Sequence, residues 1–79
     1  MDVLLYTRRG CHLCEAVEEV LAWHAPAARM VDVGGDALLE RDYGLRVPVL
    51  LIDGQVVAEG RIEEAEVTLL LATGIRGPG

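Results

Sequence analysis

Four residue types are missing from this sequence, which contains no lysine, phenylalanine, serine or asparagine. Gaps of this kind are typical of GC-rich coding, and the lack of asparagine suits a heat-loving source. Without lysine, the formal positive charge rests on seven arginines, and thirteen carboxylates bring the net charge to −6. Because an acidic chain repels phosphate backbones, we do not expect nucleic-acid binding.

Long apolar runs are also missing. Hydrophobic residues make up 52% of the chain, yet no uninterrupted run approaches the roughly 20 residues that cross a bilayer. Met1 and Asp2 lead directly into a strand-like stretch, which is not the pattern of a signal peptide. We therefore expect a soluble, cytoplasmic monomer with no membrane partner.

The chain is short, at 79 residues. This length allows one domain with one small core, at a size where burial only just offsets the entropy of ordering the chain. We expect a single domain over residues 1–75 and a flexible C-terminal tail over residues 76–79.

Cysteine is scarce, but the two that occur, Cys11 and Cys14, lie close together in the sequence. A disulfide that closes so short a loop stabilises a fold little, because the entropy it removes from the unfolded chain grows with loop length. Three residues apart on a helix, however, the two side chains lie on the same side and can form a disulfide after a small rotation. The pair is therefore predicted to be a redox-active dithiol.

The cysteines fall where a strand gives way to a helix. Residues 3–6 are apolar and predict a buried strand, and apolar residues then recur every three or four positions from about Cys11 to His24. The first turn of a helix has unpaired N–H groups and the positive end of the helix dipole, which both favour a thiolate. We expect Cys11 to be the nucleophile, and Cys14, one turn further in, to be the buried resolving cysteine.

The rest of the chain predicts a second α/β unit, a hairpin and a last helix. The predicted strands cover residues 29–33, 47–52 and 55–58, and the predicted helices cover about 37–43 and 62–73, with a tight turn at Asp53–Gly54 and a helix end at Gly74. Leu38, Leu39 and Tyr43 are expected to face inward. Trp23 lies off the apolar face of the first helix, where packing at the rim of the core is favoured over contact with a partner.

The element order is thus β-α-β-α-β-β-α, with the first two strands parallel and the hairpin antiparallel. With the CxxC at the first strand-to-helix turn, Tyr6–Thr7 before it and Val47–Pro48 opening the third strand, the chain resembles the glutaredoxin branch of the thioredoxin superfamily. The resemblance implies an α/β thioredoxin-like fold of glutaredoxin type, with a four-stranded mixed sheet flanked by helices. It also implies a thiol-disulfide oxidoreductase of cell redox homeostasis that reduces protein or low-molecular-weight disulfides, with no bound cofactor and with glutathione as electron donor.

The resemblance further implies roles for residues around the cysteines. Pro48 would follow a cis peptide bond and lie beside the disulfide, while the Val47 backbone would offer its N–H and C=O to an extended substrate. Arg8 stands where glutaredoxins commonly carry a lysine. Its guanidinium would pair with a carboxylate of glutathione or steady the thiolate.

The sequence departs from the glutaredoxin pattern at two places. Between the cysteines, glutaredoxins usually have Pro-Tyr, whereas His12 and Leu13 stand here; a protonated His12 would add positive charge beside the thiolate. Near the last helix, the Gly-Gly and Asp that hold glutathione are reduced to Gly60, with Glu59 before it. Gly60 and Arg61 are the residues left there to contact a substrate carboxylate.

Two alternatives stay open. In the first, the dithiol draws its electrons from a thioredoxin-type reductase or another thiol instead of glutathione. In the second, the chain is a metal-binding or iron-sulfur module, in which two thiolates need two more ligands and only His12 and His24 are available, or in which Cys11 shares a cluster between two chains. One chain does not easily build such a site, so no metal is expected.

Overall fold

The computed structural model describes residues 1–73. Its elements are β1 (Val3–Thr7), α1 (His12–His24), β2 (Arg29–Asp32), a short 3-10 helix η1 (Val33–Gly35), α2 (Ala37–Tyr43), β3 (Val49–Ile52), β4 (Gln55–Glu59) and α3 (Glu64–Thr73). This is the predicted order with one added turn at η1. The predicted tail and the predicted helix end at Gly74 lie outside the described residues.

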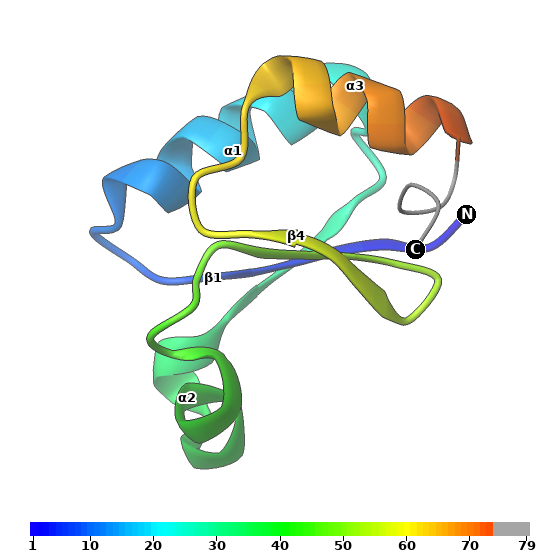
Figure 1. The fold of residues 1–79 in the computed structure, drawn as a ribbon. Helices are drawn as coiled ribbons and strands as arrows, with labels where there is room; N and C mark the ends of the chain where they lie inside the picture. The colour runs from blue at the N-terminus through cyan, green and yellow to red at the C-terminus, as the bar shows by residue number, and fades with distance from the viewer. Residues whose placement is uncertain (74–79) are drawn as a thin grey trace.

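The four strands form one mixed sheet in the order β2-β1-β3-β4. The central strand β1 runs parallel to β2 and antiparallel to β3, and β3 runs antiparallel to β4 with an irregularity between Leu50 and Leu51. Figure 1 shows α1 and α3 on one face of this sheet and α2 on the other side. The predicted α/β architecture, a four-stranded mixed sheet flanked by helices, is confirmed.

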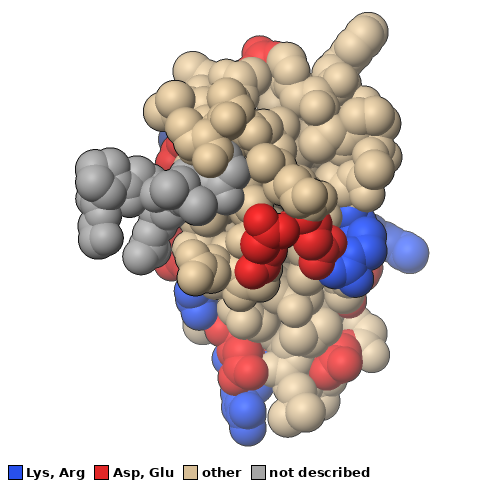
Figure 2. Space-filling model, turned by 90° about the vertical axis from the view of Figure 1, so that its right-hand side faces the viewer, with Lys and Arg blue, Asp and Glu red and all other residues tan. Residues whose placement is uncertain are grey.

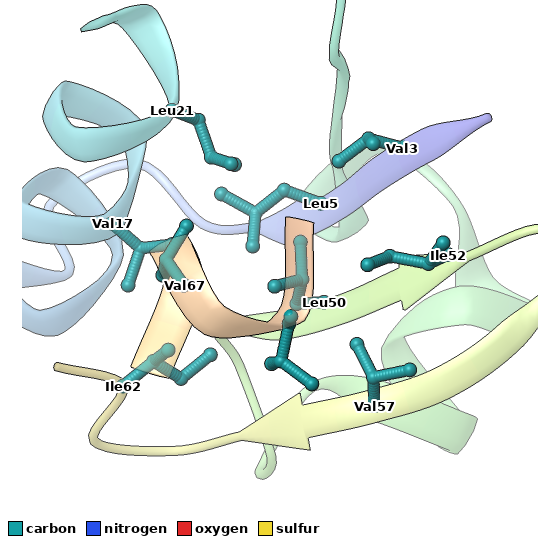
Figure 3. Packing of buried hydrophobic residues seen from close by; sticks show 10 residues of the cluster. Val3, Leu5, Val17, Leu21, Leu50, Ile52, Val57, Ile62 and Val67 are labelled. Carbon is teal, nitrogen blue, oxygen red and sulfur yellow. The ribbon is translucent and has the colours of Figure 1, made fainter. Parts of the chain in front are cut away.

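The core lies between the sheet and the layer formed by α1 and α3. Alternate residues of β1 are buried, and α1 buries Cys14, Val17 and Leu21, which recur at helical spacing. In Figure 3, Leu21 of α1 reaches toward Leu5 of β1, and Val67 of α3 lies beside Val17. The buried cluster consists of Val3, Leu5, Val17, Leu21, Leu50, Ile52, Val57, Ile62, Val67 and Leu70.

Several element ends differ from the predicted ones, and two of the differences have a clear local reason. β3 begins at Val49 because Pro48, after a cis bond to Val47, has no N–H to donate to a ladder. β2 stops at Asp32, whose carboxylate accepts a hydrogen bond from the Gly34 N–H and opens a turn. The helix predicted from residue 62 begins at Glu64.

Two side-chain predictions are wrong. Leu38 does not face inward, since it is 62% exposed and α2 contains no buried residue. Leu39 and Tyr43 are half-buried, in line with the prediction, and the ring of Tyr43 stacks on Tyr6 of β1 with centroids 4.5 Å apart. Trp23 does not pack at the rim of the core but is 81% exposed, because about 200° of helical rotation separates it from the buried Leu21.

Asp2 joins the start of the chain to the first residue of β2 and to the turn after β3. Arg29 donates hydrogen bonds of 2.9 and 3.1 Å to the carboxylate of Asp2, and the Asp2 N–H donates to Asp53. Figure 2 shows this end of the molecule, where acidic and basic side chains adjoin and the surface above them carries few charges. No helix within residues 1–73 is both long and apolar enough to span a bilayer.

We predict that Leu5→Ala destabilises the protein by roughly 2–5 kcal/mol, because it leaves a cavity where helix and sheet meet. Leu45→Ala is the matched control, since Leu45 is fully exposed, and its effect should stay within about 0.5 kcal/mol. Urea unfolding followed by circular dichroism measures both. Equal losses of stability in the two variants would contradict this description of the core.

Candidate active site at the start of α1

Cys11 caps the N-terminus of α1 with its sulfur. The residue has extended backbone angles, its side chain accepts a hydrogen bond of 3.2 Å from the Cys14 N–H, and its carbonyl accepts one of 2.9 Å from the Glu15 N–H. The turn before it is closed by a hydrogen bond from the Cys11 N–H to the Arg8 carbonyl, across Gly10 at φ +81°. An N–H donor and the positive end of a helix both stabilise negative charge on this sulfur.

The two cysteines differ in exposure. Cys11 is partly exposed and Cys14 is completely buried, as predicted, and both are free thiols. Burial raises the pKa of the Cys14 thiol, and a hydrogen bond with Cys11 raises it further, while the Thr7 hydroxyl and the Arg8 backbone act in the opposite direction. Cys11 is therefore the sulfur that a substrate can reach, and Cys14 is held as a neutral thiol behind it.

Arg8 lies near the cysteines but is engaged by α2. Its guanidinium pairs with the carboxylate of Glu40 and donates a hydrogen bond of 3.1 Å to the Gly44 carbonyl. Glu40 is the main cause of the raised pKa of Arg8, and the charge of Cys11 adds a smaller part. Arg8 thus ties the loop before Cys11 to the end of α2.

Pro48 lies at the same end of the sheet as the cysteines. The Val47–Pro48 bond is cis, and the register of β1 and β3, which pairs Tyr6 with Val49, brings Pro48 next to Thr7. The Gly60 N–H donates a hydrogen bond of 2.9 Å to the Pro48 carbonyl. The backbone N–H of Gly60 is therefore engaged by the proline loop.

The other two predicted contact residues lie on the surface. The His12 side chain is almost fully exposed, with Nδ1 at 3.8 Å from a carboxylate oxygen of Glu15. Arg61 is also exposed and lies 3.7 Å from a carboxylate oxygen of Glu63. Each is thus beside an acidic neighbour, at distances that leave the side chain free to reorient.

Glu18 and Glu40 of this region had no role in the sequence-based prediction, and Thr7 entered it only as part of the pattern Tyr6–Thr7 before the cysteines. The Thr7 hydroxyl, which is nearly buried, donates a hydrogen bond of 2.6 Å to a carboxylate oxygen of Glu18. The spacing of four residues between Cys14 and Glu18 could have indicated that Glu18 lies near the cysteines, because it puts both residues on one side of a helix. Nothing in the sequence links Glu40 to Arg8.

Metal ligands do not gather in the described part of the chain. Within residues 1–73, no group of three or more His, Cys, Asp or Glu side chains is arranged to hold an ion. His24, one of the two histidines weighed as a ligand, hydrogen-bonds Glu64 of α3 at 2.9 Å. That contact joins the end of α1 to the start of α3, far along the helix from the cysteines.

Comparisons with known proteins point to one family. A family model described as Glutaredoxin-like domain (DUF836) matches residues 2–72. The X-ray structure of a structural-genomics target protein from X. campestris is 36% identical with a TM-score of 0.80, and the match covers 91% of this chain and 97% of that chain. The solution structure of the same target is 37% identical with a TM-score of 0.71, and covers 92% and 95%.

A more distant structure, described as that of a malarial protein, shares the fold at 15% identity and a TM-score of 0.55, covering 92% of this chain and 94% of that one. The comparison with curated proteins gave no match. The fold prediction is thus supported from two sides, by the family model and by the solved structures.

We predict that Gly44→Ala destabilises the protein by roughly 1–3 kcal/mol, because a Cβ at this position would overlap the Glu40 carbonyl and crowd Arg8. Gly35→Ala is the control, since a Cβ there meets no atom within 4 Å, and it should be neutral or slightly stabilising. Urea unfolding measures both. If Gly44→Ala leaves stability unchanged, the contact between Arg8 and α2 does not constrain the loop before Cys11.

Proposed function

The chain belongs to the family of glutaredoxin-like domains (DUF836), and on that premise we propose that it is a thiol-disulfide oxidoreductase in which Cys11 and Cys14 reduce protein or low-molecular-weight disulfides. The observation that carries this proposal is the hydrogen bond from the Cys14 N–H to the sulfur of Cys11. It stabilises a thiolate on the exposed cysteine, while a second thiol is buried one turn behind.

The reaction has two exchange steps. The Cys11 thiolate attacks one sulfur of the substrate disulfide, the substrate S–S bond breaks, and a mixed disulfide forms as the other substrate sulfur leaves as a thiolate. Cys14, deprotonated, then attacks the Cys11 sulfur and releases the second substrate sulfur. Two electrons pass to the substrate, and the protein is left with a Cys11–Cys14 disulfide that an external thiol must reduce.

Specific contacts favour an electron donor other than glutathione. Binding of glutathione requires cations for its carboxylates, and here Arg8 is paired with Glu40 and Arg61 lies beside Glu63. The Gly60 N–H donates its hydrogen bond to the Pro48 carbonyl. The second candidate function is therefore the same dithiol chemistry with electrons supplied by a thioredoxin-type reductase or another thiol.

We predict that iodoacetamide at neutral pH modifies Cys11 of the reduced native protein well before Cys14. Cys11 is partly exposed and its sulfur accepts a hydrogen bond from the Cys14 N–H, whereas Cys14 is fully buried and its pKa is raised. Mass spectrometry of the peptides locates the label. Cys11→Ser should abolish turnover of a peptide disulfide, and Cys14→Ser should accumulate the mixed disulfide. Equal labelling of the two cysteines, or full turnover in Cys11→Ser, would overturn the proposal.

We also predict that the oxidised protein is reduced faster by NADPH with a thioredoxin reductase than by NADPH with glutathione and glutathione reductase. The expected cause is the pairing of Arg8 with Glu40, which leaves one cation fewer for a glutathione carboxylate. Glu40→Gln tests that cause, because freeing Arg8 should increase the rate with glutathione and leave the other rate unchanged. If glutathione reduces the unaltered protein faster, the electron donor is glutathione, as in glutaredoxins, and the prediction is wrong.

A further inference from the structure

The segment between α2 and β3 contains one residue whose backbone has no partner. Within the described part of the chain, no hydrogen bond involves the N–H or the C=O of Val47. The residues on its two sides are held. The Arg46 N–H donates a hydrogen bond of 2.8 Å to the Tyr43 carbonyl, and the Pro48 carbonyl accepts one from Gly60. A backbone donor and acceptor that are free together can pair with an extended peptide.

This free backbone lies toward the cysteines. The antiparallel register of β1 and β3 leads Val47 toward the loop that carries Cys11. The same loop is tied to the segment after α2, because Arg8 donates a hydrogen bond of 3.1 Å to the Gly44 carbonyl. A peptide that pairs with Val47 is therefore near the end of the molecule at which Cys11 attacks.

The Arg46 side chain joins this segment to the end of β4. Its Nε and Nη2 atoms donate hydrogen bonds of 2.9 and 2.5 Å to one carboxylate oxygen of Glu59, and Nη1 lies 3.4 Å from the Asp42 carbonyl oxygen. The guanidinium also lies 5.3 Å from the centre of the Tyr43 ring, which stacks on Tyr6 of β1. Arg46 thus contacts α2 and β4 at once.

The register of the sheet explains why these groups meet. Val49 of β3 is paired with Tyr6 on one side and with Glu59 on the other, so the three side chains lie next to one another on one face. Val49, in the middle, is completely buried. Arg46 reaches across this strand, from the ring pair to the carboxylate of Glu59.

The end of β4 therefore holds the free backbone from both sides. Glu59 holds Arg46 with its carboxylate. Gly60, the next residue, holds Pro48 with its N–H. Because both side chains of the ion pair are 44% exposed, the pair adds little to folding stability. Its effect is expected on the position of Val47 instead.

We propose that Arg46 is a positioning residue that, through its pair with Glu59, holds the Val47 backbone in place to bind a peptide substrate. The inference rests on the proposed function. It names the preferred substrates as disulfides flanked by an extended peptide backbone, in preference to small disulfides that have no peptide group.

The test compares two disulfides that differ in having a backbone. One is an uncharged disulfide-linked peptide, and the other is bis(2-hydroxyethyl) disulfide, which cannot pair with Val47 through peptide groups. The reduced protein is mixed with each, and acid quenching with mass spectrometry gives the second-order rate constant of its oxidation.

The variants separate the ion pair from the charge of an arginine. Arg46→Met removes the guanidinium and keeps an apolar stem over the sheet, and Glu59→Ala removes the partner and serves alone if Arg46→Met folds poorly. Arg41→Met is the matched control, since Arg41 is an exposed arginine of α2 that pairs with the neighbouring Asp42.

We expect Arg46→Met and Glu59→Ala each to lower the rate constant with the peptide by roughly tenfold, because a misplaced backbone orients the substrate poorly. The double variant should lose no more than either single variant, since the two residues act as one pair. The rate constant with the small disulfide should stay unchanged in all of them. Arg41→Met should match the parent protein with both disulfides.

Equal losses with the peptide and the small disulfide would overturn the inference, since general damage to the site predicts them. An unchanged rate constant with the peptide in both single variants would also overturn it. So would a faster peptide reaction in Glu59→Ala, because Arg46 would then act by binding the substrate itself when released. If the parent protein is oxidised by neither disulfide, the proposed function fails instead, so the two failures are distinguishable.

Discussion

The hydrogen bond from the Cys14 N–H to the Cys11 sulfur is the contact on which the rest of this structure depends. It is at once a helix cap and a stabiliser of negative sulfur. For the cap to form, β1 must end and α1 must begin within a few residues, and Gly10 supplies the left-handed turn between them. The chemistry of the dithiol therefore follows from where a helix starts, and the helix starts where a core strand ends.

The acidic balance of the chain affects the arginines around the dithiol. With thirteen carboxylates against seven arginines, two of the arginines around the site form ion pairs within the chain. Arg8 pairs with Glu40, and Arg46 pairs with Glu59 while its guanidinium lies 5.3 Å from the centre of the Tyr43 ring. These contacts hold α2 and the loops around the cysteines.

Most of the fold was open to prediction from the sequence, because its signals are local. The hairpin turn at Asp53–Gly54 has positive φ at both residues, as the sequence pattern requires, and Asp36 caps α2 through hydrogen bonds to Leu38 and Leu39. The inward side of α2 was predicted only in part. Its apolar pattern placed Leu38 and Tyr43 inside, but Leu38 is 62% exposed, while the ring of Tyr43 stacks on Tyr6, a residue far away in the chain.

The sequence by itself determined the position of the two cysteines at a strand-to-helix turn, the order of the elements, and which cysteine is buried, because each follows from periodicity and caps within one segment. Only the tertiary structure decided that Arg8 meets Glu40, that Gly60 holds Pro48, and that Thr7 donates a hydrogen bond to Glu18. The partner of a polar side chain depends on the packing and register of distant elements, and spacing along one segment does not contain that information.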